Sequence, residues 1–223
     1  MMKILVVGNE AQHQEMQEKF PNKELFHYQS SHDFGRTFLK GFSAVIDFTV
    51  QTNTEILEEY RGAEHLVVFA HCINTSLAEI YYMQGEFDFT IIGFNGLHTC
   101  INRSLWELSA LHEESQTKAK VVLDELQIAH EWVADRVGMA SPRVICMIIN
   151  EAYFTVQEGT ASREDIDLGM KLGTNYPYGP FEWCNKIGLT AVYELLEALY
   201  EDTKDERYKI CPLLKREYLL QAE

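Results

Sequence analysis

The chain has 223 residues, enough for one large domain or two small ones, and its 46% apolar and 24% charged residues are ordinary for a globular protein. Nineteen basic and 34 acidic residues give a net charge of −15, which repels nucleic acid and anionic membrane surfaces, so we expect neither as a partner. No apolar run approaches the roughly 18 residues that span a membrane. The first eight residues are too short a run for a signal peptide, and the five scattered cysteines favour free thiols. We therefore expect a cytoplasmic protein.

Strands and helices alternate through the first part of the chain. Short apolar runs predict strands at residues 3–7, 24–28, 43–48, 65–70, 87–93 and 130–134. Helices are expected between them at residues 10–19, 53–61, 75–83 and 115–127, and the segment 105–111 fits either structure. This alternation predicts the α/β class, with a Rossmann-like, mostly parallel sheet. Ligands of such sheets bind at the carboxyl ends of the strands, which here are followed by residues 8–10, 71–72 and 94–100.

The second part of the chain has the pattern of an all-α domain. Ser141 followed by Pro142 is typical of a helix start, and apolar residues then recur at helical spacing as far as Gly159. Four further helices are expected: one from Ser162 closed by Gly173, and others beginning at Pro180, Thr190 and Pro212. We therefore predict two domains, a degenerate Rossmann-like dinucleotide-binding domain at 1–136 and a helical domain at 137–223.

A series of motifs in the helical part points to a known family. They are Asn150-Glu-Ala, the run EGTASREDID at 158–167, MKLG at 170–173, YPYGPFE at 176–182 and IGL at 187–189. In order and spacing this series resembles the C-terminal domain of the 3-hydroxyacyl-CoA dehydrogenases. The resemblance implies an oxidoreductase of acyl-CoA metabolism, NAD as the cofactor, a small acyl-CoA-like ligand and a homodimer formed through the helical domain.

The nucleotide-binding residues that the resemblance implies are mostly replaced. The family has a glycine-rich turn after the first strand, and here only Gly8 matches it, while Glu10 places a negative charge where a pyrophosphate would lie. Tyr28 and Gln29 stand where the family has an acidic residue for the ribose. Only about 14 residues, Gln29 to Phe42, follow the second strand, so the helical excursion that contacts coenzyme A is expected to be missing.

The catalytic residues of the family match at one position. The family has a catalytic His–Glu pair. Glu107 stands at the Glu position, and His98 is the nearest candidate for the histidine that acts as general base. The substrate-binding Ser falls on His71 or Cys72. Two alternatives remain: Cys72 as a nucleophile with His98 and Glu107, or a zinc site formed by His71, Cys72, His98 and Cys100. We expect no metal site.

These observations predict a 3-hydroxyacyl-CoA dehydrogenase-like protein in which NAD binding and catalysis are impaired or lost. One alternative is a fully active NAD-dependent 3-hydroxyacyl-CoA or related hydroxy-acid oxidoreductase. Another is a non-catalytic dimeric binding or regulatory protein on the same scaffold. The candidate site residues are Glu107, His98 and Cys72 for catalysis and Gly8 for the cofactor.

Overall fold

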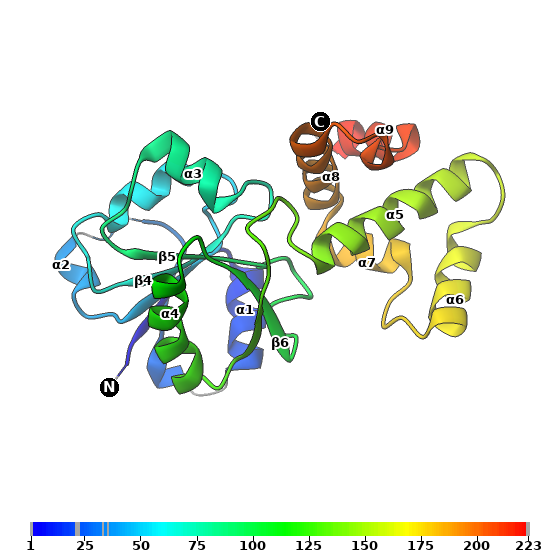
Figure 1. Ribbon diagram of the computed structural model, residues 1–223. Coiled ribbons are helices and arrows are strands. Elements are labelled where there is room, and N and C mark those ends of the chain that lie inside the picture. Colours follow the sequence, from blue (N-terminus) through cyan, green and yellow to red (C-terminus); the bar gives the residue numbers. More distant parts are fainter. Residues whose placement is uncertain (1, 21–22, 33, 35, 222–223) are drawn as a thin grey trace. The chain divides into compact units, whose positions relative to one another are not determined.

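The computed structural model describes residues 2–20, 23–32, 34 and 36–221. The chain divides into two compact units, residues 1–139 and 140–223. The first unit is a seven-stranded sheet with helices on both faces, and the second consists of helices (Figure 1).

The sheet of the first unit has the strand order β2-β1-β3-β4-β5-β6-β7. Its members are β1 (Ile4–Val7), β2 (Phe26–Gln29), β3 (Ala44–Asp47), β4 (Val67–His71), β5 (Thr90–Phe94), β6 (Leu105–Ser109) and β7 (Ala129–Trp132). All neighbours are parallel except β5 and β6, which are antiparallel. The ambiguous segment at 105–111 is thus a strand. The strand order reverses between β1 and β3, and this is the switch point at which such sheets bind ligands.

Two apolar layers cover the sheet because successive strand residues point to opposite faces. Ile4 and Val6 pack in one layer, whereas Leu5 and Val7 pack in the other. The first layer is completed by α1 (Glu10–Lys19) and α4 (Glu113–Glu125), which Figure 1 shows on one side of the sheet. The second is completed by α2 (Arg36–Leu39), the 3-10 helix η2 (Thr54–Tyr60) and α3 (Leu77–Gln84). A short 3-10 helix, η1 (Lys23–Leu25), precedes β2.

Side-chain caps mark the starts of η2 and α3 in the first unit. Asn53 caps η2 as expected, but the segment is a 3-10 helix instead of an α-helix. Ser76 caps α3 by accepting a hydrogen bond from the backbone N–H of Glu79. The carboxylate of Asp135 adds to this cap, because its two oxygens accept the N–H groups of Leu77 and Ala78 at 2.8 and 2.9 Å. A residue from the end of the unit therefore anchors a helix from its middle.

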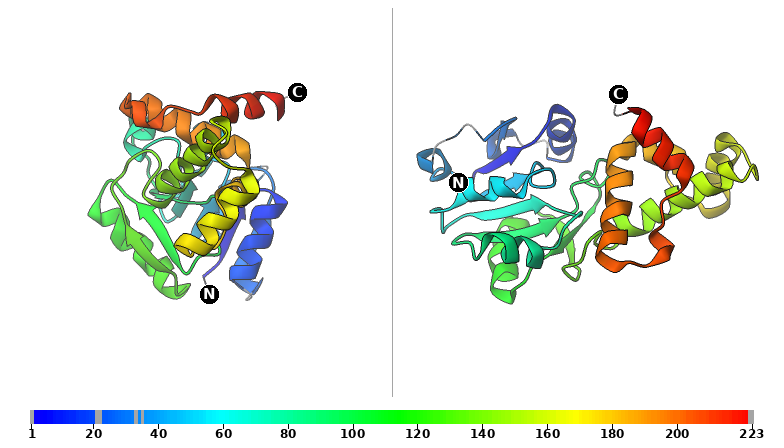
Figure 2. Two further views of the ribbon diagram at one scale, coloured as in Figure 1. Left: turned by 90° about the vertical axis from the view of Figure 1, so that its right-hand side faces the viewer. Right: turned by 90° about the horizontal axis from the view of Figure 1, so that it is seen from above.

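The second unit contains α5 (Ser141–Gln157), α6 (Arg163–Thr174), α7 (Pro180–Ile187), α8 (Leu189–Thr203), the 3-10 helix η3 (Glu206–Tyr208) and α9 (Pro212–Gln221). Figure 2 shows α9 beside α8, with which it packs. α5 begins at Ser141, as expected, with Ala140 in the N-cap position. The expected end of the next helix was wrong: Gly173 lies inside α6, which runs to Thr174 and is capped by Asn175 in the left-handed conformation. An asparagine tolerates that conformation, so no glycine is needed there.

The family-like motifs of the second unit are structural supports. The buried Asn150 donates to the carbonyl of Lys209 and accepts the N–H of Cys211, both at 2.9 Å, which joins α5 to the segment before α9. Asp167 on α6 accepts the N–H groups of Phe181 and Glu182, the first turn of α7. These contacts give the Asn150 and Asp167 motifs a structural role, since each holds one helix to the next segment of the unit.

Candidate functional site

The turn after β1 is closed by its own side chains. Asn9 accepts a hydrogen bond from the backbone N–H of Gln12 at 3.0 Å, and Gln12 accepts one from the N–H of Asn9 at 2.9 Å. A Cβ atom built on Gly8 would lie 2.6 Å from Oε1 of Gln12, so that side chain covers the glycine. Glu10 adds a carboxylate to the first turn of α1. A pyrophosphate would need the backbone N–H groups of Asn9 and Gln12 and the open face of Gly8. Side chains of the turn already occupy all three.

The neighbouring strand offers no acidic group for a ribose. β2 ends with Tyr28 and Gln29, and the carbonyl of Gln29 accepts the N–H of Gly8 at 3.0 Å. The ring of Tyr28 packs edge-on against His13 of α1, with centroids 5.0 Å apart. Burial lowers the pKa of His13, so the contact joins two neutral rings. This corner of the sheet is occupied by aromatic packing.

His71 and Cys72, at the end of β4, are both buried in neutral form. Nδ1 of His71 accepts the backbone N–H of Gly96 at 3.0 Å, and burial lowers the pKa of His71 to about 4. Burial raises the pKa of Cys72 to about 12, with the nearby charge of Asp135 adding to the shift. A thiol with this pKa is a poor nucleophile at neutral pH, so the structure does not favour the Cys72 mechanism.

Glu107 lies on β6, one residue before Leu108, which pairs with the last residue of β5, Phe94. The residue opposite Glu107 is Asn95, whose backbone N–H donates to the carbonyl of Glu107 at 3.3 Å. An amide cannot exchange a proton as a general base does, so Asn95 itself cannot act as the base beside Glu107. Sequence reasoning missed Asn95, although the antiparallel register of β5 and β6 brings it there directly.

His98 pairs with a different carboxylate. Its Nδ1 lies 2.7 Å from Oε2 of Glu15, a buried residue of α1. Glu15 also accepts the N–H groups of Thr99 and Asn102, at 3.3 and 3.1 Å. Glu15 thus fixes the loop that follows β5 onto α1, and His98 takes part in that anchor with its ring partly exposed.

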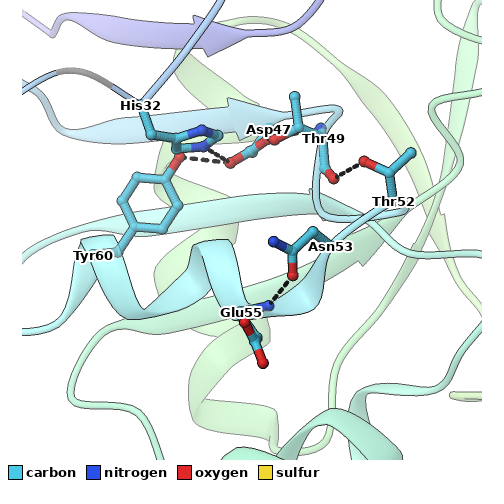
Figure 3. Close-up of polar contacts among 7 residues, drawn as sticks. All are labelled: His32, Asp47, Thr49, Thr52, Asn53, Glu55 and Tyr60. Carbon is cyan, nitrogen blue, oxygen red and sulfur yellow. Dashed lines mark hydrogen bonds and ion pairs between the residues drawn. The ribbon is translucent and has the colours of Figure 1, made fainter.

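A second buried carboxylate stands at the switch point of the sheet. Asp47, fully buried at the end of β3, accepts the hydroxyl of Tyr60 at 2.6 Å and Nε2 of His32 at 2.8 Å on one oxygen (Figure 3). Its other oxygen accepts the N–H and the hydroxyl of Thr49, at 2.8 and 2.6 Å. Burial, with the charge of Asp47, raises the pKa of Tyr60 well above its usual value. The four bonds tie β3 to η2 and to the loop after β2.

Sequence reasoning also missed the Asp47 cluster. The available signal was a charged residue at the end of the apolar run Ala44–Asp47, because such a residue is buried only when it is fully hydrogen-bonded. Among the described residues no group of three or more His, Cys, Asp or Glu side chains could hold a metal ion, so the zinc alternative has no support. The five cysteines are buried free thiols. Within the same described part of the chain, no helix combines the length and apolarity of a membrane span.

Comparison with known proteins agrees with these observations on the helical unit. The family model of the 3-hydroxyacyl-CoA dehydrogenase C-terminal domain matches residues 138–221. The chain is 46% identical over 90 residues to 3-hydroxyadipyl-CoA dehydrogenase of Escherichia coli K12, covering 40% of this chain and 19% of that protein. It is 38% identical over 106 residues to a probable 3-hydroxybutyryl-CoA dehydrogenase of Bacillus subtilis, covering 45% of this chain and 37% of that protein.

A solved structure matches over the whole chain at the level of fold. The (S)-3-hydroxybutyryl-CoA dehydrogenase of Ralstonia eutropha superposes with a TM-score of 0.72 and 20% identity, covering 100% of this chain and 94% of that one. The two curated relatives, by contrast, are matched over well under half of their length. Residues 138–221 are therefore similar to the C-terminal domain of the 3-hydroxyacyl-CoA dehydrogenases, and the whole chain shares the fold of one such enzyme.

Proposed function

We propose that this chain is a 3-hydroxyacyl-CoA dehydrogenase-like protein that has lost productive NAD binding and catalysis and serves as a dimeric binding or regulatory scaffold. The observation that carries the proposal is the closed turn after β1, where Asn9 and Gln12 hydrogen-bond each other's backbone and Glu10 adds a negative charge. A dinucleotide that binds at this turn needs free amides and close approach to glycine. Neither condition is met, so NAD does not fit the residues present.

The acid–base residues support the same proposal. A 3-hydroxyacyl dehydrogenase needs a base that removes the proton of the hydroxyl group while hydride leaves. Asn95 beside Glu107 cannot supply that base, and His71, nearby on β4, is buried with a low pKa. His98 pairs through Nδ1 with Glu15 of α1, whereas the resemblance assigns the carboxylate of that pair to Glu107.

The scaffold role is supported by α6. None of the residues of this helix is buried, although Leu168 and Leu172 are apolar and 54% and 78% exposed. Exposed apolar side chains on the surface of a helix are typical of a contact surface between proteins. We propose that a second copy of the chain covers them.

Titration with NADH, followed by its fluorescence, tests the loss of cofactor binding. We expect no saturable signal up to about 1 mM NADH and no reduction of acetoacetyl-CoA, with an active 3-hydroxybutyryl-CoA dehydrogenase measured in parallel as the positive control. Micromolar NADH binding together with turnover that Glu107→Gln abolishes would refute the proposal and establish the active oxidoreductase.

A further inference from the structure

Phe48, the residue after β3, fills the carboxyl edge of the sheet at its switch point. Its backbone N–H donates to the carbonyl of Val7 at 2.9 Å, which places it between the ends of β1 and β3. The side chain is only 3% exposed, although it leaves the sheet at the edge where ligands of such folds bind. The residues around Phe48 show how so large a ring is accommodated at this edge.

Two glycines make room for that ring. A Cβ atom built on Gly8 would lie 3.0 Å from Cδ2 of Phe48, and one built on Gly96 would lie 2.9 Å from Cδ1 and 3.0 Å from Cε1. Distances this short are below normal carbon–carbon contact, so any larger residue at Gly8 or Gly96 would have to displace the ring or other atoms. The close approach that glycine permits is therefore used by Phe48 itself and is not left for a ligand.

Aromatic residues of β4 and β5 hold the ring in place. Phe94 meets Phe48 edge-to-face, with centroids 5.3 Å apart, and His71 lies at 6.5 Å on a tilted plane. His71 in turn accepts the N–H of Gly96, so the loop after β5 is fastened over the same position. Together these contacts span the ends of β1, β3, β4 and β5.

We propose that Phe48 is an intramolecular plug, an aromatic side chain that occupies the ligand position of the Rossmann-like unit and keeps its edge closed. The inference rests on the proposed loss of NAD binding and adds the residue that closes the site. Removal of the ring leaves a space bounded by two glycines and flanked by aromatic side chains. The class of ligand that fits this space is a planar heteroaromatic ring such as that of a nucleoside.

The test compares three proteins: the unaltered chain, Phe48→Ala and the matched control Phe89→Ala. Phe89 is also a buried phenylalanine, 4% exposed, but it precedes β5 and so lies at the amino end of that strand. Adenosine, which carries no phosphate to be repelled by Glu10, is titrated by calorimetry, and NADH by fluorescence. Cooperative urea unfolding establishes that each variant is folded. If Phe48→Ala is not folded, Phe48→Val replaces it, since it also removes the ring.

We expect Phe48→Ala to bind adenosine at least tenfold more tightly than the unaltered chain and than Phe89→Ala. Equal adenosine binding by Phe48→Ala and Phe89→Ala would show a nonspecific cavity and overturn the plug. A folded Phe48 variant that binds neither adenosine nor NADH would also overturn it, while the proposed function would stand. Tight NADH binding by the unaltered chain would overturn both.

Discussion

At the scale of single residues, the first unit depends on a carboxylate that has no contact with water. Asp47 receives four hydrogen bonds, from Thr49 twice and from Tyr60 and His32. Asp47→Asn replaces an acceptor-only group with an amide that presents two donors to some of those partners. We expect the free energy of unfolding to fall by about 3 kcal/mol, measured by urea denaturation.

The matched control for Asp47 is Asp124→Asn, at an exposed carboxylate whose partner is Lys120 on the same helix. That change should cost less than about 0.5 kcal/mol. Equal losses for the two variants would show that the buried cluster contributes no more than a surface ion pair.

His71 predicts how the stability of the protein depends on pH. Its pKa is about 4 in the folded chain, because of burial, against 6.5 for the ordinary value. The unfolded chain therefore takes up this proton first as the pH falls, and protonation favours unfolding. His71 leaves the free energy of unfolding unchanged well above pH 6.5, and the loss that it causes grows to about 3 kcal/mol as the pH falls to about 4.

The measurement is the free energy of unfolding at several pH values between 7.5 and 4.5. His71→Gln should flatten the slope below pH 6.5. An unaltered slope in His71→Gln would show that His71 is not buried in neutral form.

At the scale of elements, α6 and the segment that joins it to α7 contain glycines of two kinds. Gly179 has no room for a side chain, whereas Gly169 does. A Cβ atom at Gly179 would lie 2.3 to 2.4 Å from three side-chain atoms of Asp167, whereas one at Gly169 would meet nothing within 4 Å. Gly179→Ala should therefore displace the carboxylate that caps α7 and cost about 2 kcal/mol. Gly169→Ala, inside α6, should stabilise the protein by about 0.5 to 1 kcal/mol. Thermal unfolding followed by circular dichroism distinguishes these opposite signs.

Much of the element pattern could be predicted from local sequence, because helix caps and apolar runs act over a few residues. Asn53 and Ser162 cap helices at the expected starts, whereas Ser76 caps α3 although the expected helix began at residue 75. Gly173 was misassigned because glycine both ends helices and occurs inside them, and the choice depends on Asn175 beyond it. The type of a helix is similarly hard to predict, since η2 carries the cap of an α-helix.

The candidate site was less predictable, because its partners come together only in the folded sheet. Loss of the glycine-rich turn could be seen at Gly8 and Glu10 in the sequence. The pairing of Glu15 with His98, and the position of Asn95 opposite Glu107, depend on the packing of α1 and the register of β5 and β6. Local sequence patterns carry no information about such contacts, because the two residues are far apart in the chain and meet only when the sheet and its helices have packed.

At the scale of the whole molecule, the exposed face of α6 predicts the assembly state. Leu172→Glu places a charge at a side chain that is 78% exposed, so it should hardly affect the fold but should separate a dimer that buries it. Light scattering should give twice 25.8 kDa for the unaltered chain and 25.8 kDa for the variant. Val121→Glu, at a 65% exposed residue of α4, serves as the control and should remain dimeric. A monomeric unaltered chain at high concentration would refute the proposed dimer.

The cap that Asp135 forms on α3 also sets an order of events during protein synthesis. The carboxylate is 58 residues away from Leu77 along the chain. At roughly 5 to 20 residues per second, a ribosome needs roughly 3 to 12 s to add those residues. When that interval begins, β1 to β4 have been synthesised, but the first turn of α3 lacks the acceptor that Asp135 supplies. The first unit should therefore be most exposed to proteases and chaperones on the ribosome while β5, β6 and β7 are being made.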